Sequence, residues 1–141
     1  MQVSFVPFDH VRAVWPRVEG FMERAAARTG GRYTGDDVLS MVEDLGYQLW
    51  VAFEERGEIK GAVVTGIQEY PRKRALQVMF CGGKDVREWQ YPMFDIVKKW
   101  AQDANCSCIE SSGRSGWAKL FANSGYTPLW NTFEFDVGVG E

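Results

Sequence analysis

Residues 48–81 constrain the fold most, because apolar and polar side chains alternate there in three consecutive short segments. Residues 48–54, 59–70 and 75–81 each show the two-residue period of a half-buried strand. The segments between them, 55–58 and 71–74, are short and rich in charged residues, with a glycine or a proline, as turns are. Connections this short join only antiparallel neighbours. The middle of the chain is therefore predicted to form a three-stranded antiparallel sheet.

Helical periodicity and further strand patterns flank this sheet on both sides. Thr34 followed by Asp37 predicts a capped helix start, and Asp85 followed by Glu88 predicts another. Pro92 falls near the start of the long helix that Asp85 would cap. The flanking elements are predicted to be a strand over 2–7, helices over 11–25, 34–45 and 85–104, a strand over 106–111, a helix over 115–123 and a strand over 127–137.

The resulting order, β-α-α-β-β-β-α-β-α-β, is typical of the α+β class. It predicts helices flanking a mixed, mostly antiparallel sheet. A length of 141 residues without an internal repeat or a linker indicates one domain spanning residues 1–141.

Composition and charge exclude several classes of function. The chain is 45% hydrophobic, which is enough to build a core. Its 16 Lys and Arg against 19 Asp and Glu leave a net charge of −3, so binding to nucleic acid or to anionic membranes is not expected. We expect neither a membrane-spanning run nor a targeting leader. Three cysteines, an odd number, favour a reducing compartment, and a cytoplasmic protein is expected.

Two segments give the chain a family resemblance over nearly its whole length. The first is the predicted strand over 75–81, which runs through Gly82 and Gly83 into the long helix. The second is the segment 116–126, which holds most of the predicted short helix and its end at glycine and tyrosine. Together with the order of elements, they resemble the GNAT (Gcn5-related N-acetyltransferase) superfamily. More narrowly, the chain is similar to small GNAT-like proteins of tailed phages and prophages, in Val-Trp-Pro at 14–16, Thr-Gly-Gly-Arg-Tyr-Thr at 29–34, Leu-Trp-Val-Ala-Phe at 49–53 and Tyr-Pro-Arg at 70–72.

The resemblance implies an acetyl-CoA site at the end of the third central strand. In the family this strand, the following loop and the long helix hold the cofactor, which assigns it here to Phe80, Cys81, Gly82, Gly83 and Lys84. Adjacent glycines before a helix suit a pyrophosphate, because its oxygens need unobstructed backbone N–H donors. The usual family loop, Arg/Gln-x-x-Gly-x-Gly/Ala, is absent, and a plain turn leaving a strand explains the two glycines equally well.

Glu69 and Glu110 are the candidate general bases. The family's geometry places both carboxylates at strand positions where one would take a proton from the attacking amine. The alternative is a solvated charge for Glu69 and a salt-bridged one for Glu110. The family's usual general acid is a tyrosine on the closing helix, and Phe121, which has no proton to give, stands at that position here.

The cysteines are not expected to carry chemistry. The single histidine, His10, lies near the first helix and is not placed to activate Cys81, which is interpreted as a small buried side chain. Cys106 and Cys108 lack the second pair of ligands that zinc requires, so no metal site is expected.

Two functions from different classes stay open at this point. The first is acetyl-CoA-dependent transfer of an acetyl group to an amine on a small-molecule or protein acceptor. The second is a catalytically degenerate phage or prophage protein that keeps the fold for protein contacts, in a virion, against a host factor or with a second copy. A capping Asp85 would occupy N–H donors that a phosphate needs, and with Phe121 it favours the second function. Trp89 and Trp130, whose burial the pattern leaves open, would anchor such an interface.

Overall fold

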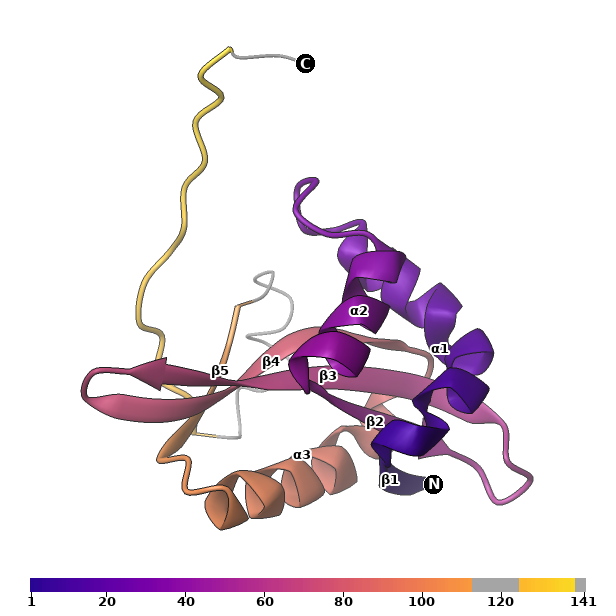
Figure 1. The fold of residues 1–141 in the computed structure, drawn as a ribbon. Helices are drawn as coiled ribbons and strands as arrows, with labels where there is room; N and C mark the ends of the chain where they lie inside the picture. The colour runs from indigo at the N-terminus through magenta and orange to yellow at the C-terminus, as the bar shows by residue number, and fades with distance from the viewer. Residues whose placement is uncertain (113–124, 139–141) are drawn as a thin grey trace.

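The structure, a computed structural model, describes residues 1–112 and 125–138. Within these residues the strands form one sheet in the order β1-β2-β3-β4-β5. Figure 1 shows α1 and α2 on one side of the sheet and α3 on the other. The elements are β1 (Gln2–Val6), the 3-10 helix η1 (Phe8–His10), α1 (Val11–Ala26), α2 (Gly35–Leu45), β2 (Gln48–Phe53), β3 (Ile59–Tyr70), β4 (Lys73–Gly83), α3 (Val86–Asp103) and β5 (Cys108–Ser111).

Strand pairing confirms the predicted fold class. The strands β1 to β4 form an antiparallel meander, in which each strand pairs with its neighbour. Strand β5 instead runs parallel to β4, because α3 carries the chain back along the sheet before β5 begins. The molecule is thus α+β, with a mostly antiparallel sheet between helices.

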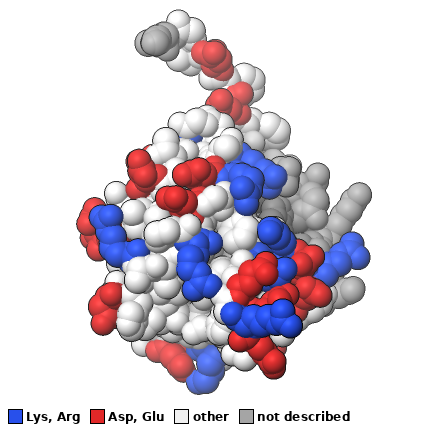
Figure 2. All heavy atoms as spheres, turned by 90° about the vertical axis from the view of Figure 1, so that its right-hand side faces the viewer, with Lys and Arg blue, Asp and Glu red and all other residues white. Residues whose placement is uncertain are grey.

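Positive and negative side chains are mixed on the surface, as the small net charge of the chain leads us to expect. Figure 2 shows the face that lies on the right of Figure 1, where Lys and Arg side chains alternate with Asp and Glu. No field of a single sign covers this face, so any site that binds an anion there must be a local cluster.

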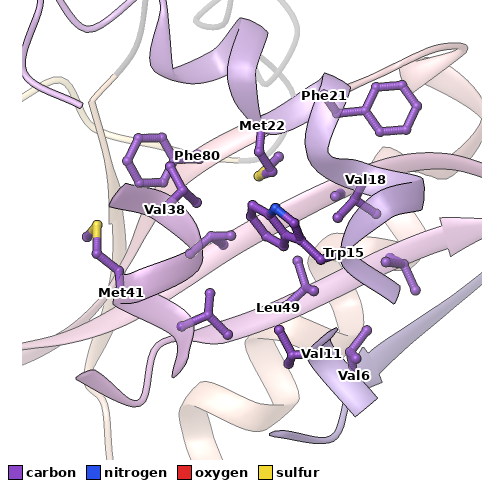
Figure 3. Packing of buried hydrophobic residues seen from close by; sticks show 14 of the residues in the cluster. Val6, Val11, Trp15, Val18, Phe21, Met22, Val38, Met41, Leu49 and Phe80 are labelled. Atoms are coloured by element: carbon purple, nitrogen blue, oxygen red, sulfur yellow. The ribbon is translucent and has the colours of Figure 1, made fainter. Parts of the chain in front are cut away.

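Two apolar cores lie on opposite faces of the sheet. On one face, Trp15 and Met22 of α1 and Val38 of α2 pack onto Leu49 of β2 and Phe80 of β4, as Figure 3 shows. On the other face, Trp89, Met93 and Val97 of α3 pack onto side chains of β2, β3 and β4. Successive residues of a regular strand point to opposite faces of the sheet. When one strand residue packs in one core, its two neighbours therefore face the other core.

Two of the helices contain a proline without being interrupted. Helix α1 passes through Pro16, and α3 begins at Val86 and passes through Pro92. Among the described helices, none has the length and apolarity that crossing a membrane requires.

The start of α2 carries the predicted capping box. The Thr34 hydroxyl accepts a hydrogen bond from the Asp37 backbone N–H, and the Asp37 carboxylate accepts one from the Thr34 N–H. Replacing Thr34 by alanine is expected to lower the free energy of unfolding by about 1 kcal/mol, because an N–H donor loses its partner. Urea unfolding measures this change. The exposed Ser40, in the interior of the same helix, is the matched control, and an equal loss in Ser40→Ala would contradict the capping role.

The predicted strand over 127–137 is wrong. These residues form no strand in the structure, and Trp130, Phe133 and Phe135 are exposed. Figure 1 shows the segment running away from the sheet. The alternating pattern supplies two faces for a strand, but a strand also needs an edge to pair with, and the pattern does not encode one. The predicted helix over 115–123, including Phe121, lies outside the described residues.

Candidate functional site

Among the described residues, the second half of β4 has no partner strand along the edge that faces β5. The two strands pair only from Ala75 with Cys108 to Val78 with Ser111, while β4 continues to Gly83. Among the described residues, nothing therefore pairs with this edge after Val78. Its backbone groups need partners, because backbone N–H and C=O groups are rarely left without one.

A β-bulge lies where this opening begins. The register of β3 and β4 shifts between Val64 paired with Phe80 and Thr65 paired with Val78, which leaves Met79 as an extra residue. As a result, Met79 and Phe80 both pack on the side of α1 and α2. A bulge bends its strand and redirects backbone groups, and bulges are over-represented beside active sites.

The two candidate bases lie on opposite faces of the sheet. Glu110 of β5 stands beside Gln77 of β4, one position from Ile109 and Leu76, which face the α3 core. Glu110 is therefore on the α1 and α2 face, the same face as Met79.

Glu69 lies on the α3 face and is held there by Arg74. The Arg74 guanidinium donates to the Glu69 carboxylate at 2.6 Å and to the backbone carbonyl of Ala104, just after α3, at 2.9 Å. The sequence-based pairing of Glu69 and Glu110 as equivalent candidates did not foresee that the sheet separates them.

Tyr70 is the partner of Glu110 that the sequence did not identify. Its hydroxyl donates a hydrogen bond of 2.5 Å to the Glu110 carboxylate, across 40 positions of sequence. This hydrogen bond raises the pKa of the Tyr70 phenol, with a further contribution from burial. A pairing between β3 and β5 has no local sequence signal, because the two strands are not even adjacent in the sheet.

The predicted phosphate-binding glycines belong to β4 itself. Gly82 pairs with Ala62 and Gly83 with Gly61 of β3. A Cβ atom on Gly82 would lie 2.8 Å from the Phe21 carbonyl oxygen of α1, and one on Gly83, where φ is +149°, would lie 2.4 Å from the carbonyl oxygen of Lys60. Both positions thus need glycine for close backbone packing.

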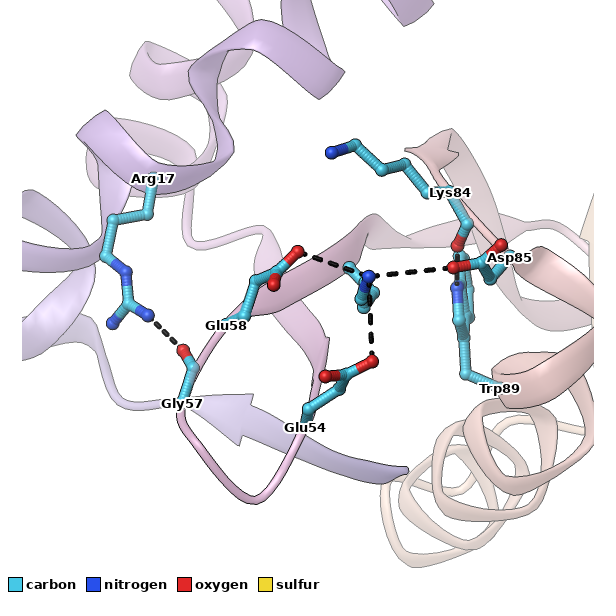
Figure 4. Close-up of polar contacts among 8 residues, drawn as sticks. Arg17, Glu54, Gly57, Glu58, Lys84, Asp85 and Trp89 are labelled. Carbon is cyan, nitrogen blue, oxygen red and sulfur yellow. Dashed lines mark hydrogen bonds and ion pairs between the residues drawn. The ribbon is translucent and has the colours of Figure 1, made fainter.

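The turn that follows is closed by hydrogen bonds and ion pairs. The Lys84 backbone N–H donates to the Lys60 carbonyl at 2.7 Å. The Lys60 ammonium lies 3.2 Å from Glu58, 3.5 Å from Glu54 and 3.6 Å from Asp85 (Figure 4). The hydrogen bond to Glu58 is the largest of the effects that together raise the pKa of Lys60.

The expected capping role of Asp85 is wrong. Asp85 stands at the N-cap of α3 with φ of +52°, and its side chain makes no capping hydrogen bond. The left-handed backbone at this position directs the carboxylate to Lys60, so the Asp85 side chain occupies none of the first N–H groups of α3, although the Glu88 N–H donates to the Asp85 backbone carbonyl at 2.9 Å.

Phe80 and Cys81 point to opposite faces of β4. Phe80 is buried against α1 and α2, whereas Cys81 packs against the α3 core. Burial raises the pKa of the Cys81 thiol from 9.0 to about 12, so the thiol is protonated at neutral pH. A side chain in this state is a poor nucleophile.

We expect native Cys81 to react with iodoacetamide far more slowly than Cys106 or Cys108. All three side chains are partly exposed, but burial raises the pKa of the Cys81 thiol from 9.0 to about 12, which lowers the thiolate fraction of Cys81 at pH 8 about a thousandfold. Mass spectrometry of peptides after timed alkylation at pH 8 measures the three rates, and the difference should vanish in urea. Fast labelling of native Cys81 would contradict the protonated, packed thiol.

A hollow lies beside the end of β4, between α1 and the start of β3. Its volume is about 580 Å³, and the residues that line it are Pro16, Arg17, Gly20, Phe21, Arg24, Glu58, Ile59 and Lys84. Of these residues, the sequence predicts a role in ligand binding for Lys84 alone. Arg17 and Arg24 are seven positions apart on one helix face, a spacing that would have paired them, but nothing in the sequence places that face against β4.

Comparison with known proteins gives matches of structure alone. No protein-family model and no curated protein matches the sequence. An aminoglycoside acetyltransferase from an uncultured soil metagenomic sample has a TM-score of 0.72 and 14% identity, covering 97% of this chain and 98% of that one. A ribosomal-protein-alanine N-acetyltransferase from Brucella melitensis has a TM-score of 0.67 and 14% identity, covering 96% and 99%.

A third solved structure agrees. The tetramutant of the BH1408 protein from Bacillus halodurans has a TM-score of 0.70 and 14% identity, covering 97% of this chain and 100% of that one. Because these matches extend over almost the full length of both chains, they reflect the whole architecture and not a shared motif. The chain therefore has the fold of the GNAT acetyltransferases, as its resemblance to that superfamily predicted.

Proposed function

We propose that this protein binds acetyl-CoA and transfers the acetyl group to the amine of an acceptor. The observation that carries the proposal is the open edge of β4 after the bulge at Met79, with Glu110 on the same face of the sheet. An extended, amide-containing ligand fits such an edge, because it can pair with the backbone groups that β5 leaves open.

The residues around this edge would perform three tasks in acetyl transfer: binding the donor, polarising its carbonyl and removing a proton from the amine. Bound acetyl-CoA would supply an acetyl thioester. Backbone N–H groups of β4 beyond Val78 would hold the ligand and polarise its acetyl carbonyl. Glu110 would take a proton from the attacking amine, and Tyr70 would hold the Glu110 carboxylate in place through its hydrogen bond. The products are the N-acetylated acceptor and the free thiol of CoA.

The proposal is tested by calorimetric titration of the protein with acetyl-CoA and, separately, with CoA. Micromolar affinity for both is expected, and release of free thiol in the presence of a panel of primary amines should follow. A thermal-shift measurement at millimolar ligand is the second readout. Absence of both heat and thermal shift would overturn the proposal.

A further inference from the structure

We propose that the hollow beside β4 binds the phosphate groups of the acyl donor through the side chains of Arg17, Arg24 and Lys84. The inference rests on the proposed function and deepens it: cationic side chains take the place of the backbone cradle that a glycine loop would provide.

The three cations converge on one hollow from two elements. Arg17 and Arg24 belong to α1, and Lys84 follows directly on Gly83 at the end of β4. Figure 4 shows the Lys84 side chain extending away from the Lys60 cluster, toward the helix that carries Arg17. Among the described residues, Arg24 and Lys84 make no ion pair.

Contacts with uncharged groups hold the two guanidinium groups in place. The Arg17 guanidinium donates to the Gly57 backbone carbonyl, and the Arg24 guanidinium lies 5.5 Å from the centre of the Phe21 ring. Neither contact neutralises charge, so both groups keep their charge and further N–H donors for a ligand. A guanidinium that is already positioned binds a phosphate with less loss of side-chain entropy.

The acidic residue in the lining does not cancel this charge. Glu58 is the one carboxylate among the lining residues, and its carboxylate lies 3.2 Å from the Lys60 ammonium. The lining residues thus hold three cations and one carboxylate, and that carboxylate shares the Lys60 ammonium with Glu54 and Asp85. In a chain of net charge −3, such a local excess of positive charge favours an anion.

The closed turn explains why side chains would replace backbone donors. The Lys84 N–H is bonded to the Lys60 carbonyl, and the Asp85 carboxylate lies at the start of α3, where it repels an anion. The hollow instead lies on the α1 side of β4, the face that also carries Met79 and Glu110. A ligand along the open edge of β4 could therefore reach the hollow at its phosphate end.

The test compares three ligands by calorimetry: CoA, pantetheine, which lacks the phosphates, and inorganic pyrophosphate. The double variant Arg17→Gln/Arg24→Gln should bind CoA and pyrophosphate about 10 to 100-fold more weakly, since each lost contact was a charge-assisted hydrogen bond. Its affinity for pantetheine should not change. Increasing salt should weaken CoA binding more in the wild type than in this variant.

Two further variants keep the result interpretable. Arg28→Gln/Arg72→Gln removes the same charge from exposed positions that do not line the hollow, and it should bind CoA like the wild type. Lys84→Gln keeps its backbone N–H and should weaken CoA binding without affecting Arg17 and its contact with Gly57.

The outcomes separate this inference from the proposed function. Equal CoA affinity in both double variants, with acetyl transfer intact, would overturn the phosphate site and leave the function standing. Binding of pyrophosphate that depends on Arg17 and Arg24, without any binding of CoA, would overturn the assignment of the site to an acyl donor.

Discussion

Replacing Glu110 by glutamine is expected to lower kcat/KM for acetyl transfer about 10² to 10⁴-fold, the usual contribution of a general base. Glutamine keeps the size of the side chain and can still accept the Tyr70 hydrogen bond, but it cannot take a proton from the amine. The rate of thiol release from acetyl-CoA, measured with the best amine of the panel, gives the effect. Thermal unfolding should show that the variant remains folded, and CoA affinity should be unchanged.

Glu69→Gln is the matched comparison, because it removes a carboxylate of the same type from the opposite face of the sheet. Glu69 pairs with Arg74 and not with the open edge of β4, so this variant should leave kcat/KM nearly unchanged and lower the free energy of unfolding by at most about 1 kcal/mol, the scale of a surface ion pair. Tyr70→Phe should shift the pH profile of kcat without abolishing activity, because it removes only the group that positions Glu110. A large loss in Glu69→Gln with none in Glu110→Gln would contradict the assignment of the base.

Replacing Trp89 by alanine is expected to lower the free energy of unfolding by about 3–5 kcal/mol, the cost of truncating a large buried aromatic side chain. Trp89 is 1% exposed, and its indole N–H donates to the Lys84 carbonyl at 2.8 Å. Its ring also fills the space above Gly61, where a Cβ atom would approach it to 2.3 Å. Alanine would leave a cavity between α3 and the sheet together with an unpaired carbonyl.

Trp130→Ala serves as the control for this truncation, because Trp130 is 72% exposed. Its effect on the free energy of unfolding should stay within about 0.5 kcal/mol. Urea unfolding of both variants provides the comparison. Equal losses would show that Trp130 is packed in solution, and a negligible loss in Trp89→Ala would contradict the core described for α3.

These two tryptophans also show where sequence patterns stop being informative. Both were open candidates for an exposed interface, and the structure buries Trp89 while Trp130 lies on the segment that forms no strand. Its burial excludes the interface role that the pattern left open for Trp89, because the ring fills space that Gly61 of β3 provides. A helical period gives the face of a residue, but not the shape of the surface opposite that face.

The sequence by itself determined the meander of β2, β3 and β4, the capped start of α2 and the order of elements through β5, because periodicity, turns and caps are local properties. Tertiary structure alone decided the arrangement of the candidate site. It placed Glu69 and Glu110 on opposite faces, joined Tyr70 to Glu110, turned Asp85 toward Lys60 and brought Arg17 and Arg24 to the end of β4. Each of these depends on strand register, on a bulge or on the packing of a helix across the sheet. Such pairings link residues distant in sequence, and their energies are settled only when the whole sheet has formed.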